Sequence, residues 1–367
     1  MAGDRDIRAL RASAYTVPTD GPEADGTYAW SKTTLVLVEV EAADETGLGY
    51  TYADASLCGL IGTTLVEVVV GRDAFDIPGA RAALQRHVRN LGRSGLCACA
   101  LSAIDAALWD LKAKLLAQPL AFLLGRARDR VPVYGSGGFT TYDDERLTEQ
   151  LAGWVAQGCR FVKMKIGVHD AHDAHRVEVA RAAIGDRGLF VDANGAYDVP
   201  TALAFSHRNA DLAIDWFEEP VTSDDPRGLR AVRDGAPPGM AVAAGEYIYT
   251  ADDARHLLEA GAVDVLQADV TRCGGVSGFL DVAALCEAHH TDLSGHCAPS
   301  LHRHVACGVQ RLRHVEWFHD HVRIEQMLFE GAPTLERGAM TPDLREPGHG
   351  LVFKQADAAR FLVGGHA

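Results

Sequence analysis

The sequence lacks the features that bind nucleic acid or cross a membrane. Its 35 lysines and arginines are outnumbered by 50 aspartates and glutamates, which gives a formal net charge of −15, and no basic run is present. Such a chain repels phosphate groups and anionic lipid. No segment approaches the roughly 18 uninterrupted apolar residues of a membrane span, and Met1 to Arg11 are too polar for a secretory signal. We therefore expect a cytoplasmic protein with no nucleic-acid or membrane partner.

Cysteine is also scarce, with eight in 367 residues. None forms a Cys-x-x-Cys pair, and the spacing of Cys97 and Cys99 does not suit a zinc ribbon. Most cysteines lie among apolar residues, which predicts small buried side chains in a reducing compartment. With 47% hydrophobic and 23% charged residues, the composition is that of a globular protein. The excess of carboxylates is the feature that needs an explanation.

Residues 1–125 have a mixed α+β pattern and are predicted to form an N-terminal capping domain. Thr33 to Ala42 alternates and is rich in β-branched residues, so it predicts a strand, and Gly47 to Tyr50 predicts its hairpin partner. Val17 to Tyr28 and Thr51 to Cys58 contain turn-forming residues and are predicted to be loops.

Residues 126–339 repeat a different pattern, in which short apolar runs alternate with helix-like stretches. Buried strands that alternate with helices indicate a parallel sheet, and eight such units predict a closed barrel. We therefore expect an α/β protein, a (β/α)7β TIM-like barrel with an α+β cap. Residues 340–367 are predicted to pack back on the cap. The eight predicted strands begin at Val131, Phe161, Leu189, Ile214, Met240, Val263, Thr291 and His314.

Seven consecutive predicted strands each end in, or lead into, an ionisable residue. The intervals between them are 27, 26, 28, 23, 27 and 20 residues, one strand–helix unit each. The carboxyl ends of the strands surround the active site in such barrels, so these side chains are predicted to meet at one mouth. They are Lys165, Asp192, Glu218, Glu246, Asp269, His296 and Glu316.

The second predicted strand carries two lysines on one face. Strand alternation places Lys163 and Lys165 opposite Val162, Met164 and Ile166. Because the apolar set faces the surrounding helices, both ammonium groups point into the barrel, where burying unpaired charge is costly. Repulsion between the two charges lowers the pKa of each, so one lysine is predicted to act as a base near neutral pH.

Three neighbouring strands deliver only carboxylates: Asp192, Glu218 and Glu246. Converging carboxylates repel one another unless a cation neutralises them, and a ligand set of oxygens alone favours Mg²⁺. A salt-bridge network with the two lysines is the alternative. On the next two strands, a carboxylate of Asp269 bonded to His296 would fix the tautomer and raise the basicity of the ring, although a single histidine at a strand end is often structural.

The pattern of these residues resembles that of the enolase superfamily, and within it the mandelate racemase subgroup. The resemblance covers nearly the whole chain. A lysine pair combined with an Asp/His dyad is specific to this subgroup, since the muconate-lactonizing subgroup has a second lysine in place of the histidine. Ser102 to Asp110 looks like the helix that joins cap and barrel in the family. The matching motifs are Lys163-Met164-Lys165, Val191-Asp192-Ala193-Asn194-Gly195, Phe217-Glu218-Glu219-Pro220, Gly245-Glu246, Gln267-Ala268-Asp269 with Gly274-Gly275, Gly295-His296 and Val315-Glu316-Trp317.

The resemblance implies how these groups work together. Mg²⁺ would lie on the three carboxylates and bind the carboxylate and 2-hydroxyl of a small substrate. Lys165, tuned by Lys163, and His296, backed by Asp269, would face opposite sides of the α-carbon, and either would remove its proton. The metal, Lys163 and a protonated Glu316 would stabilise the resulting enediolate.

Dehydration of an aldonic or aldaric acid is the reaction most common in this subgroup, and racemisation or epimerisation of a 2-hydroxy acid is the alternative. The predicted substrate contacts are Tyr28, Trp30, Lys32, Tyr52 and Asn194. The resemblance also implies a homo-oligomer, a dimer or an octamer. Two readings from other classes stay open: a metal-independent Schiff-base aldolase that uses Lys165, and a binding protein without catalysis.

Overall fold

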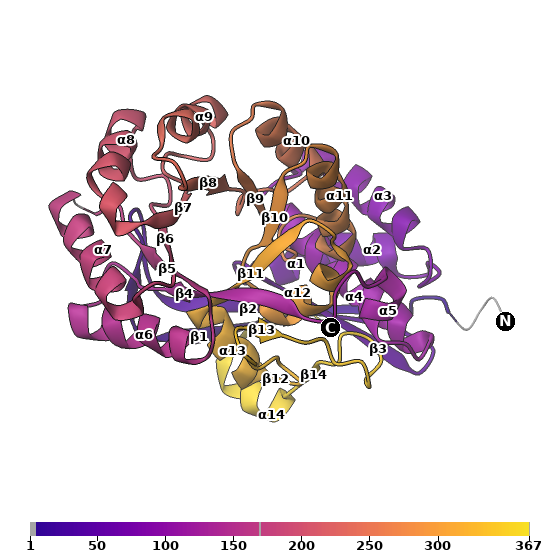
Figure 1. The fold of residues 1–367 in the computed structure, drawn as a ribbon. Coiled ribbons are helices and arrows are strands. Elements are labelled where there is room, and N and C mark those ends of the chain that lie inside the picture. Colours follow the sequence, from indigo (N-terminus) through magenta and orange to yellow (C-terminus); the bar gives the residue numbers. More distant parts are fainter. Residues whose placement is uncertain (1–4, 169, 367) are drawn as a thin grey trace.

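The computed structural model describes all residues except 1–4, 169 and 367. A closed barrel stands beside an antiparallel sheet with its own helices (Figure 1). No helix within the described residues is long and apolar enough to cross a membrane.

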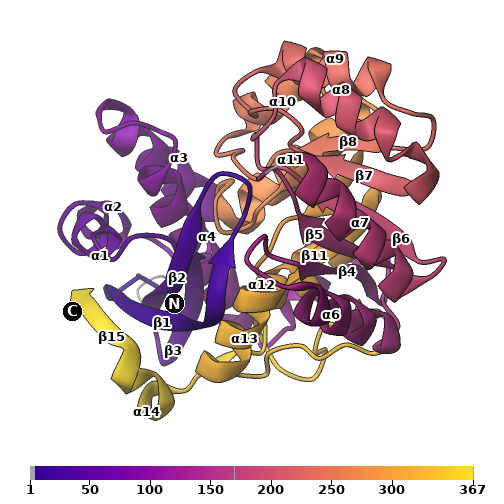
Figure 2. The same ribbon diagram turned by 90° about the vertical axis from the view of Figure 1, so that its left-hand side faces the viewer.

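The cap is a four-stranded sheet of order β15-β1-β2-β3 covered by helices on one side (Figure 2), and its edge strand β15 is formed by Leu362–His366. The core on the helical side of this sheet is formed by the valines Val36, Val38 and Val40 of β2 and by helix α4, which is buried along most of its length. Helix α4 packs so closely on β3 that a Cβ at Gly47 would lie 2.1 Å from the carbonyl oxygen of Ala107. The cap elements are β1 (Ala9–Ala24), β2 (Ala29–Ala42), β3 (Glu45–Tyr52), α1 (Leu57–Gly59), a π-helical turn (Leu60–Leu65), α2 (Val66–Val69), α3 (Ile77–His87) and α4 (Leu96–Leu115).

The barrel contains the eight predicted strands, and the prediction of this fold is confirmed. Each strand pairs in parallel with the next, and β11 closes the ring by pairing with β4. The strands are β4 (Val131–Gly137), β5 (Phe161–Lys165), β6 (Gly188–Asp192), β7 (Ile214–Glu218), β8 (Ala241–Ala244), β9 (Val265–Ala268), β10 (Asp292–Gly295) and β11 (Leu312–Phe318). The larger helices of this part are α5 (Leu120–Leu124), α6 (Asp144–Ala156), α7 (Asp170–Ile184), α8 (Val199–Arg208), α9 (Pro226–Gly235), α10 (Ala251–Glu259), α11 (Gly275–Ala288), α12 (Pro299–Val305) and α13 (His319–Leu328).

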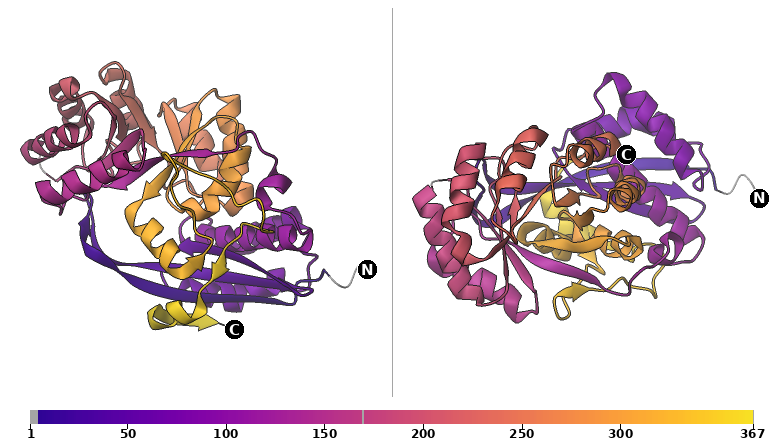
Figure 3. Two further views of the ribbon diagram at one scale, coloured as in Figure 1. Left: turned by 60° about the horizontal axis from the view of Figure 1, so that its bottom comes forward. Right: turned by 45° about the horizontal axis from the view of Figure 1, so that its top comes forward.

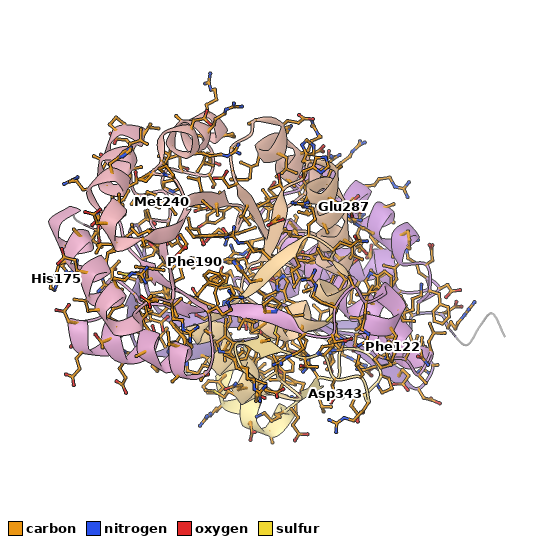
Figure 4. The ribbon with its side chains drawn as sticks, in the orientation of Figure 1. Phe122, His175, Phe190, Met240, Glu287 and Asp343 are labelled. Carbon is orange, nitrogen blue, oxygen red and sulfur yellow. The ribbon has the colours of Figure 1, made fainter. Side chains whose placement is uncertain are left out.

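A small apolar cluster fills the inside of the ring. Phe190, which Figure 4 labels among the barrel strands, stacks on Trp216 with ring centroids 5.0 Å apart. Tyr134, Ala243 and Val265 complete this cluster, and all five side chains are buried. These residues precede the polar strand ends along the chain, so they fill the interior of the barrel beneath the mouth.

The prediction of a loop over Val17 to Tyr28 is wrong. Strand β1 continues to Ala24, and a bulge between Pro18 and Glu23 absorbs the turn-forming residues before a tight turn leads into β2. Strand β15 pairs with β1 only from Ala12 to Tyr15, so Pro18 lies on a free edge, where a missing N–H group is tolerated. Of the second predicted loop, Thr51 and Tyr52 belong to β3 and Leu57 begins α1.

The C-terminal segment returns from the barrel to the cap. Strand β13 (Ala339–Met340) pairs with β4, β14 (Val352–Phe353) pairs with β12 (Phe329–Glu330), and β15 (Leu362–His366) follows α14 (Gln355–Ala358) and joins the cap sheet beside β1. The domain limits at 125 and 339 stay predictions, as do the homo-oligomer and the compartment.

Two segments of the cap reach the mouth of the barrel. The β1–β2 ribbon runs alongside the barrel (Figure 3, left), and its turn meets the ends of β5 and β6. A Cβ at Gly26 would lie 2.6 Å from the carbonyl oxygen of Ile166 and 2.9 Å from that of Ala193. At the end of β3, the Thr51 hydroxyl donates a hydrogen bond to the carbonyl oxygen of Thr271. The cap therefore covers the mouth from two sides.

Candidate active site

The predicted polar strand ends converge, and all of them are buried. Their exposed fractions range from 0% to 6%, although each side chain is ionisable. Burial of so many charges is tolerable only when opposite charges lie in direct contact.

The two lysines form an ion-pair network with the carboxylates. Lys163 Nζ lies 2.5 Å from Glu218 Oε1, 3.4 Å from Asp192 and 2.9 Å from Glu316. Lys165 Nζ lies 2.5 Å from Asp192 Oδ2. The salt-bridge network that the sequence left open as an alternative is therefore present, and Asp192 contacts both lysines.

The predicted depression of the lysine pKa values is wrong for this arrangement. Burial disfavours the charge of Lys165, and Lys163 repels it, but the carboxylate of Asp192 outweighs both and raises the pKa of Lys165 above its usual value. The pKa of Lys163 is also raised, because Glu218 and Glu316 outweigh its burial. Strand alternation alone does not reveal the carboxylates that hold the lysine protons.

Asp192, Glu218 and Glu246 form a site that fits a hard divalent cation. Each offers one oxygen, these oxygens lie within 4.8 Å of one another, and all three residues are buried. Burial and the neighbouring carboxylate of Asp192 raise the pKa of Glu218, whereas Lys165 and Lys163 overcome the burial of Asp192 and lower its pKa to about 2. A cation with oxygen ligands, of which Mg²⁺ is the best match, relieves this repulsion.

His296 and Asp269 are in contact as predicted. His296 Nδ1 lies 2.8 Å from Asp269 Oδ2, and because a carboxylate only accepts, Nδ1 carries the proton. Burial disfavours the imidazolium, but Glu316 and Asp269 outweigh it and raise the pKa of His296. The other ring nitrogen, Nε2, faces Glu316 at 3.5 Å and Glu246 at 3.6 Å. The ring is thus held with its free nitrogen toward the carboxylate cluster.

The contacts of Glu316 favour its ionised form, whereas the resemblance implied a protonated side chain. Burial disfavours its charge, but Lys163 and His296 lower its pKa well below the usual range. Ser136, which sequence reasoning missed, donates a hydrogen bond of 2.6 Å to Glu316 Oε1. Ser136 lies near the end of β4, the one barrel strand for which no polar residue was predicted. The position alone was the available signal, because a serine is too common to attract notice.

Comparison with known proteins identifies the family. Residues 146–358 match the model described as enolase C-terminal domain-like, and residues 13–125 match the N-terminal domain of mandelate racemase/muconate lactonizing enzyme. The chain belongs to the mandelate racemase subgroup of the enolase superfamily. It is therefore an enzyme, and both the sequence resemblance and the predicted fold are confirmed.

Three relatives of this superfamily member are informative. A mandelate racemase/muconate lactonizing enzyme-like protein from Rubrobacter xylanophilus is 49% identical, with a TM-score of 0.95 over 98% of this chain and 100% of that one. The 3,6-anhydro-alpha-L-galactonate cycloisomerase of Streptomyces coelicolor is 32% identical over 98% of this chain and 100% of its own length. The L-talarate/galactarate dehydratase of Salmonella typhimurium, solved with Mg and L-lyxarohydroxamate, is 27% identical, with a TM-score of 0.90 over 98% and 93%.

The five predicted substrate contacts of this superfamily member are placed unequally. Asn194 follows β6, and its backbone N–H donates to Asp192 Oδ1 at 2.9 Å, while its side-chain oxygen is buried without a hydrogen-bond partner. Tyr52 stacks on His321 with ring centroids 3.4 Å apart. Trp30 donates from Nε1 to Glu23 at 2.7 Å and stacks on Tyr28, which is 69% exposed. Lys32 is exposed on the same ribbon.

A cavity of about 590 Å³ opens at the mouth. It is lined by residues of the loops that follow β6, β7 and β8, by Asp253 of α10, and by Thr27 and Ser94 of the cap. Six of its lining side chains carry hydroxyl groups, three are acidic, and none is basic. The lining residues are Thr27, Ser94, Asn194, Gly195, Glu219, Thr222, Ser223, Asp224, Tyr247, Tyr249 and Asp253.

Proposed function

We propose that the protein is a magnesium-dependent dehydratase of a sugar acid. It would remove the proton next to the carboxylate and eliminate the 3-hydroxyl group, giving a 2-keto-3-deoxy acid. The observation that carries the proposal is the pairing of two proton-transfer groups, Lys165 on β5 and His296 after β10, around one buried carboxylate cluster. The named activity of the Salmonella typhimurium relative supports it.

Asp192, Glu218 and Glu246 would hold Mg²⁺, and the ion would supply the positive charge that makes the α-proton of a carboxylate acidic enough to remove. Lys163 adds a fixed positive charge beside the same cluster. Glu316, held by Lys163 and Ser136, places its second oxygen toward His296. These residues would orient the carboxylate end of the substrate.

Proton transfer would be divided between the two sides of the site. When a cation shares the Asp192 carboxylate, that carboxylate attracts the Lys165 ammonium less strongly. The neighbouring positive charge of Lys163 then favours loss of the Lys165 proton. Lys165 Nζ would take the α-proton. His296, whose pKa is raised, would be protonated and would give its Nε2 proton to the departing 3-hydroxyl group, which leaves as water. Asp269 holds the ring in position throughout.

Racemisation or epimerisation of a 2-hydroxy acid is the alternative reaction, because the same two groups would exchange the α-proton between faces. The Streptomyces coelicolor cycloisomerase shows that relatives include isomerases. A substrate with a 3-hydroxyl group distinguishes the two reactions directly, because only dehydration yields a 2-keto product.

The lining of the cavity favours a monocarboxylic sugar acid over a diacid. Hydroxyl and carboxylate side chains accept and donate hydrogen bonds to a polyol, whereas a second substrate carboxylate would meet Glu219, Asp224 and Asp253 without a basic partner. We expect kcat/KM to be at least about tenfold higher for an aldonate than for the aldarate of the same configuration, which corresponds to ~1.4 kcal/mol.

The measurement is a screen of matched aldonate and aldarate pairs, such as gluconate with glucarate and galactonate with galactarate, for 2-keto product. Mandelate serves as the apolar comparison. A diacid turned over as well as its matching monoacid would contradict the assignment of the cavity to the distal end of the substrate.

The turn of the cap ribbon is expected to control substrate binding. In Gly26→Ala the new Cβ would press on the carbonyl oxygens at the ends of β5 and β6, so the turn must lift from the mouth. We expect KM to rise about tenfold while Lys165 and His296 stay in place. Gly153→Ala on α6 is the matched control, since its Cβ meets nothing within 4 Å. Steady-state kinetics of both variants check this, and an unchanged KM in Gly26→Ala would show that the turn does not cover the bound substrate.

A further inference from the structure

Three potential metal ligands meet beside the cation site. His296 Nε2 and Glu316 Oε2 each lie 3.4 Å from Cys297 Sγ and 3.5 Å from each other. Cys297 follows His296 directly in the chain and is 3% exposed. The sequence predicted only that the cysteines are small buried side chains, so this cluster was not anticipated.

The three atoms are oriented by their other contacts. Asp269 binds Nδ1 of His296 at 2.8 Å, which leaves Nε2 directed at the cluster. Ser136 and Lys163 bind Oε1 of Glu316 at 2.6 and 2.9 Å, which leaves Oε2 directed at the cluster. The backbone N–H of Cys297 also donates to Oε2 at 3.1 Å, and its positive φ of 49° turns the residue toward Glu316.

The spacing of these atoms matches tetrahedral zinc. Zinc bonds of about 2.0 Å to nitrogen or oxygen and about 2.3 Å to sulfur place neighbouring ligand atoms roughly 3.3–3.6 Å apart. The three measured separations fall within that range. A mixed nitrogen, sulfur and oxygen set prefers Zn²⁺ to Mg²⁺, which the oxygen-only set of Asp192, Glu218 and Glu246 prefers.

We propose that His296, Cys297 and Glu316 form a second metal site, one that binds Zn²⁺ and thereby inhibits the enzyme. The ion would take the place of the thiol proton of Cys297 and of the Nε2 proton of His296, and both protons would be released to solvent. Binding requires only the three ligands. Inhibition rests on the proposed role of His296 as a proton donor.

Binding is tested with Co²⁺ as a spectroscopic substitute for zinc, added to the full chain in saturating Mg²⁺. We expect a thiolate-to-cobalt charge-transfer absorption that Zn²⁺ displaces and that Cys297→Ser lacks. Cys97→Ser, in the cap, is the matched control and should keep the absorption, because Cys97 lies outside the cluster. Absence of the absorption in the unmodified protein, or its persistence in Cys297→Ser, would overturn the site.

Inhibition is tested by zinc titration at saturating Mg²⁺, with each rate taken relative to the same variant without zinc. We expect the half-inhibiting zinc concentration to rise at least tenfold in Cys297→Ser and to stay unchanged in Cys97→Ser. Equal sensitivity of all three proteins would assign the inhibition to the Asp192 site and overturn the proposal. Cobalt binding through Cys297 without any zinc inhibition would overturn the role of His296 while leaving the site intact.

Discussion

Replacing Glu218 with glutamine is expected to abolish divalent-metal binding. The change keeps the shape of the side chain and an acceptor for the indole N–H of Trp216, which donates to Glu218 Oε2 at 2.9 Å. It removes one of three charged ligands, so we expect the affinity for Mg²⁺ to fall by more than about a hundredfold and turnover to be lost with it. Titration calorimetry with MgCl₂ measures the affinity.

Asp215→Asn is the control for this variant. Asp215 lies on the same strand, at the opposite end, where it accepts a hydrogen bond from the backbone of Leu189. It should keep the affinity for Mg²⁺. Unchanged affinity in Glu218→Gln would rule out the assigned cation site. Turnover by the unmodified protein in EDTA would instead favour a Schiff-base aldolase that uses Lys165, because that chemistry needs no metal.

Replacing His296 with asparagine is expected to separate the two halves of the reaction. Without the imidazole no acid of suitable pKa faces the departing hydroxyl group, so we expect dehydration to fall by about 10²–10⁴-fold. Lys165 and its partner Asp192 are unchanged, so the variant should still exchange the α-proton of the substrate. Proton NMR in D₂O measures the exchange, and the yield of 2-keto acid measures dehydration.

Lys165→Met provides the reciprocal test. This variant should lose the exchange of the substrate α-proton that Lys165 catalyses, whereas the His296–Asp269 contact should be retained. Full dehydration by His296→Asn would remove His296 from the mechanism. Exchange with no 2-keto product in the unmodified protein, across the sugar-acid library, would favour the racemase or epimerase.

The barrel was predictable because its strands repeat one simple pattern. The eight apolar runs recur at similar intervals, and seven of them end in or lead into an ionisable residue, so the order of the strands fixes the position of each side chain. The inward direction of Lys163 and Lys165 follows from the same alternation. The features of the site that depend only on the order and alternation of the strands can therefore be predicted from the sequence.

Electrostatics and the cap were harder to predict. The ionisation of Glu316 and Lys165 depends on which charges lie within a few ångströms, and these contacts join strands far apart in the chain. Pro18 and the glycine at position 21 are usual signs of a loop, yet the β1–β2 ribbon accommodates them at a bulge. Cys297 was interpreted as a small apolar residue, because its meeting with Glu316 comes from the pairing of β10 with β11.

Strand β15 has a consequence for the order of biosynthesis. It lies at the edge of the cap sheet and pairs with β1, although nearly the full length of the described chain separates the two in sequence. A ribosome therefore releases β1, β2 and the whole barrel before the edge strand exists. Contacts between such distant segments form slowly, so we expect the cap sheet to be completed last. Until then the nascent chain would expose the edge of β1, which makes this edge a natural place for a chaperone to bind.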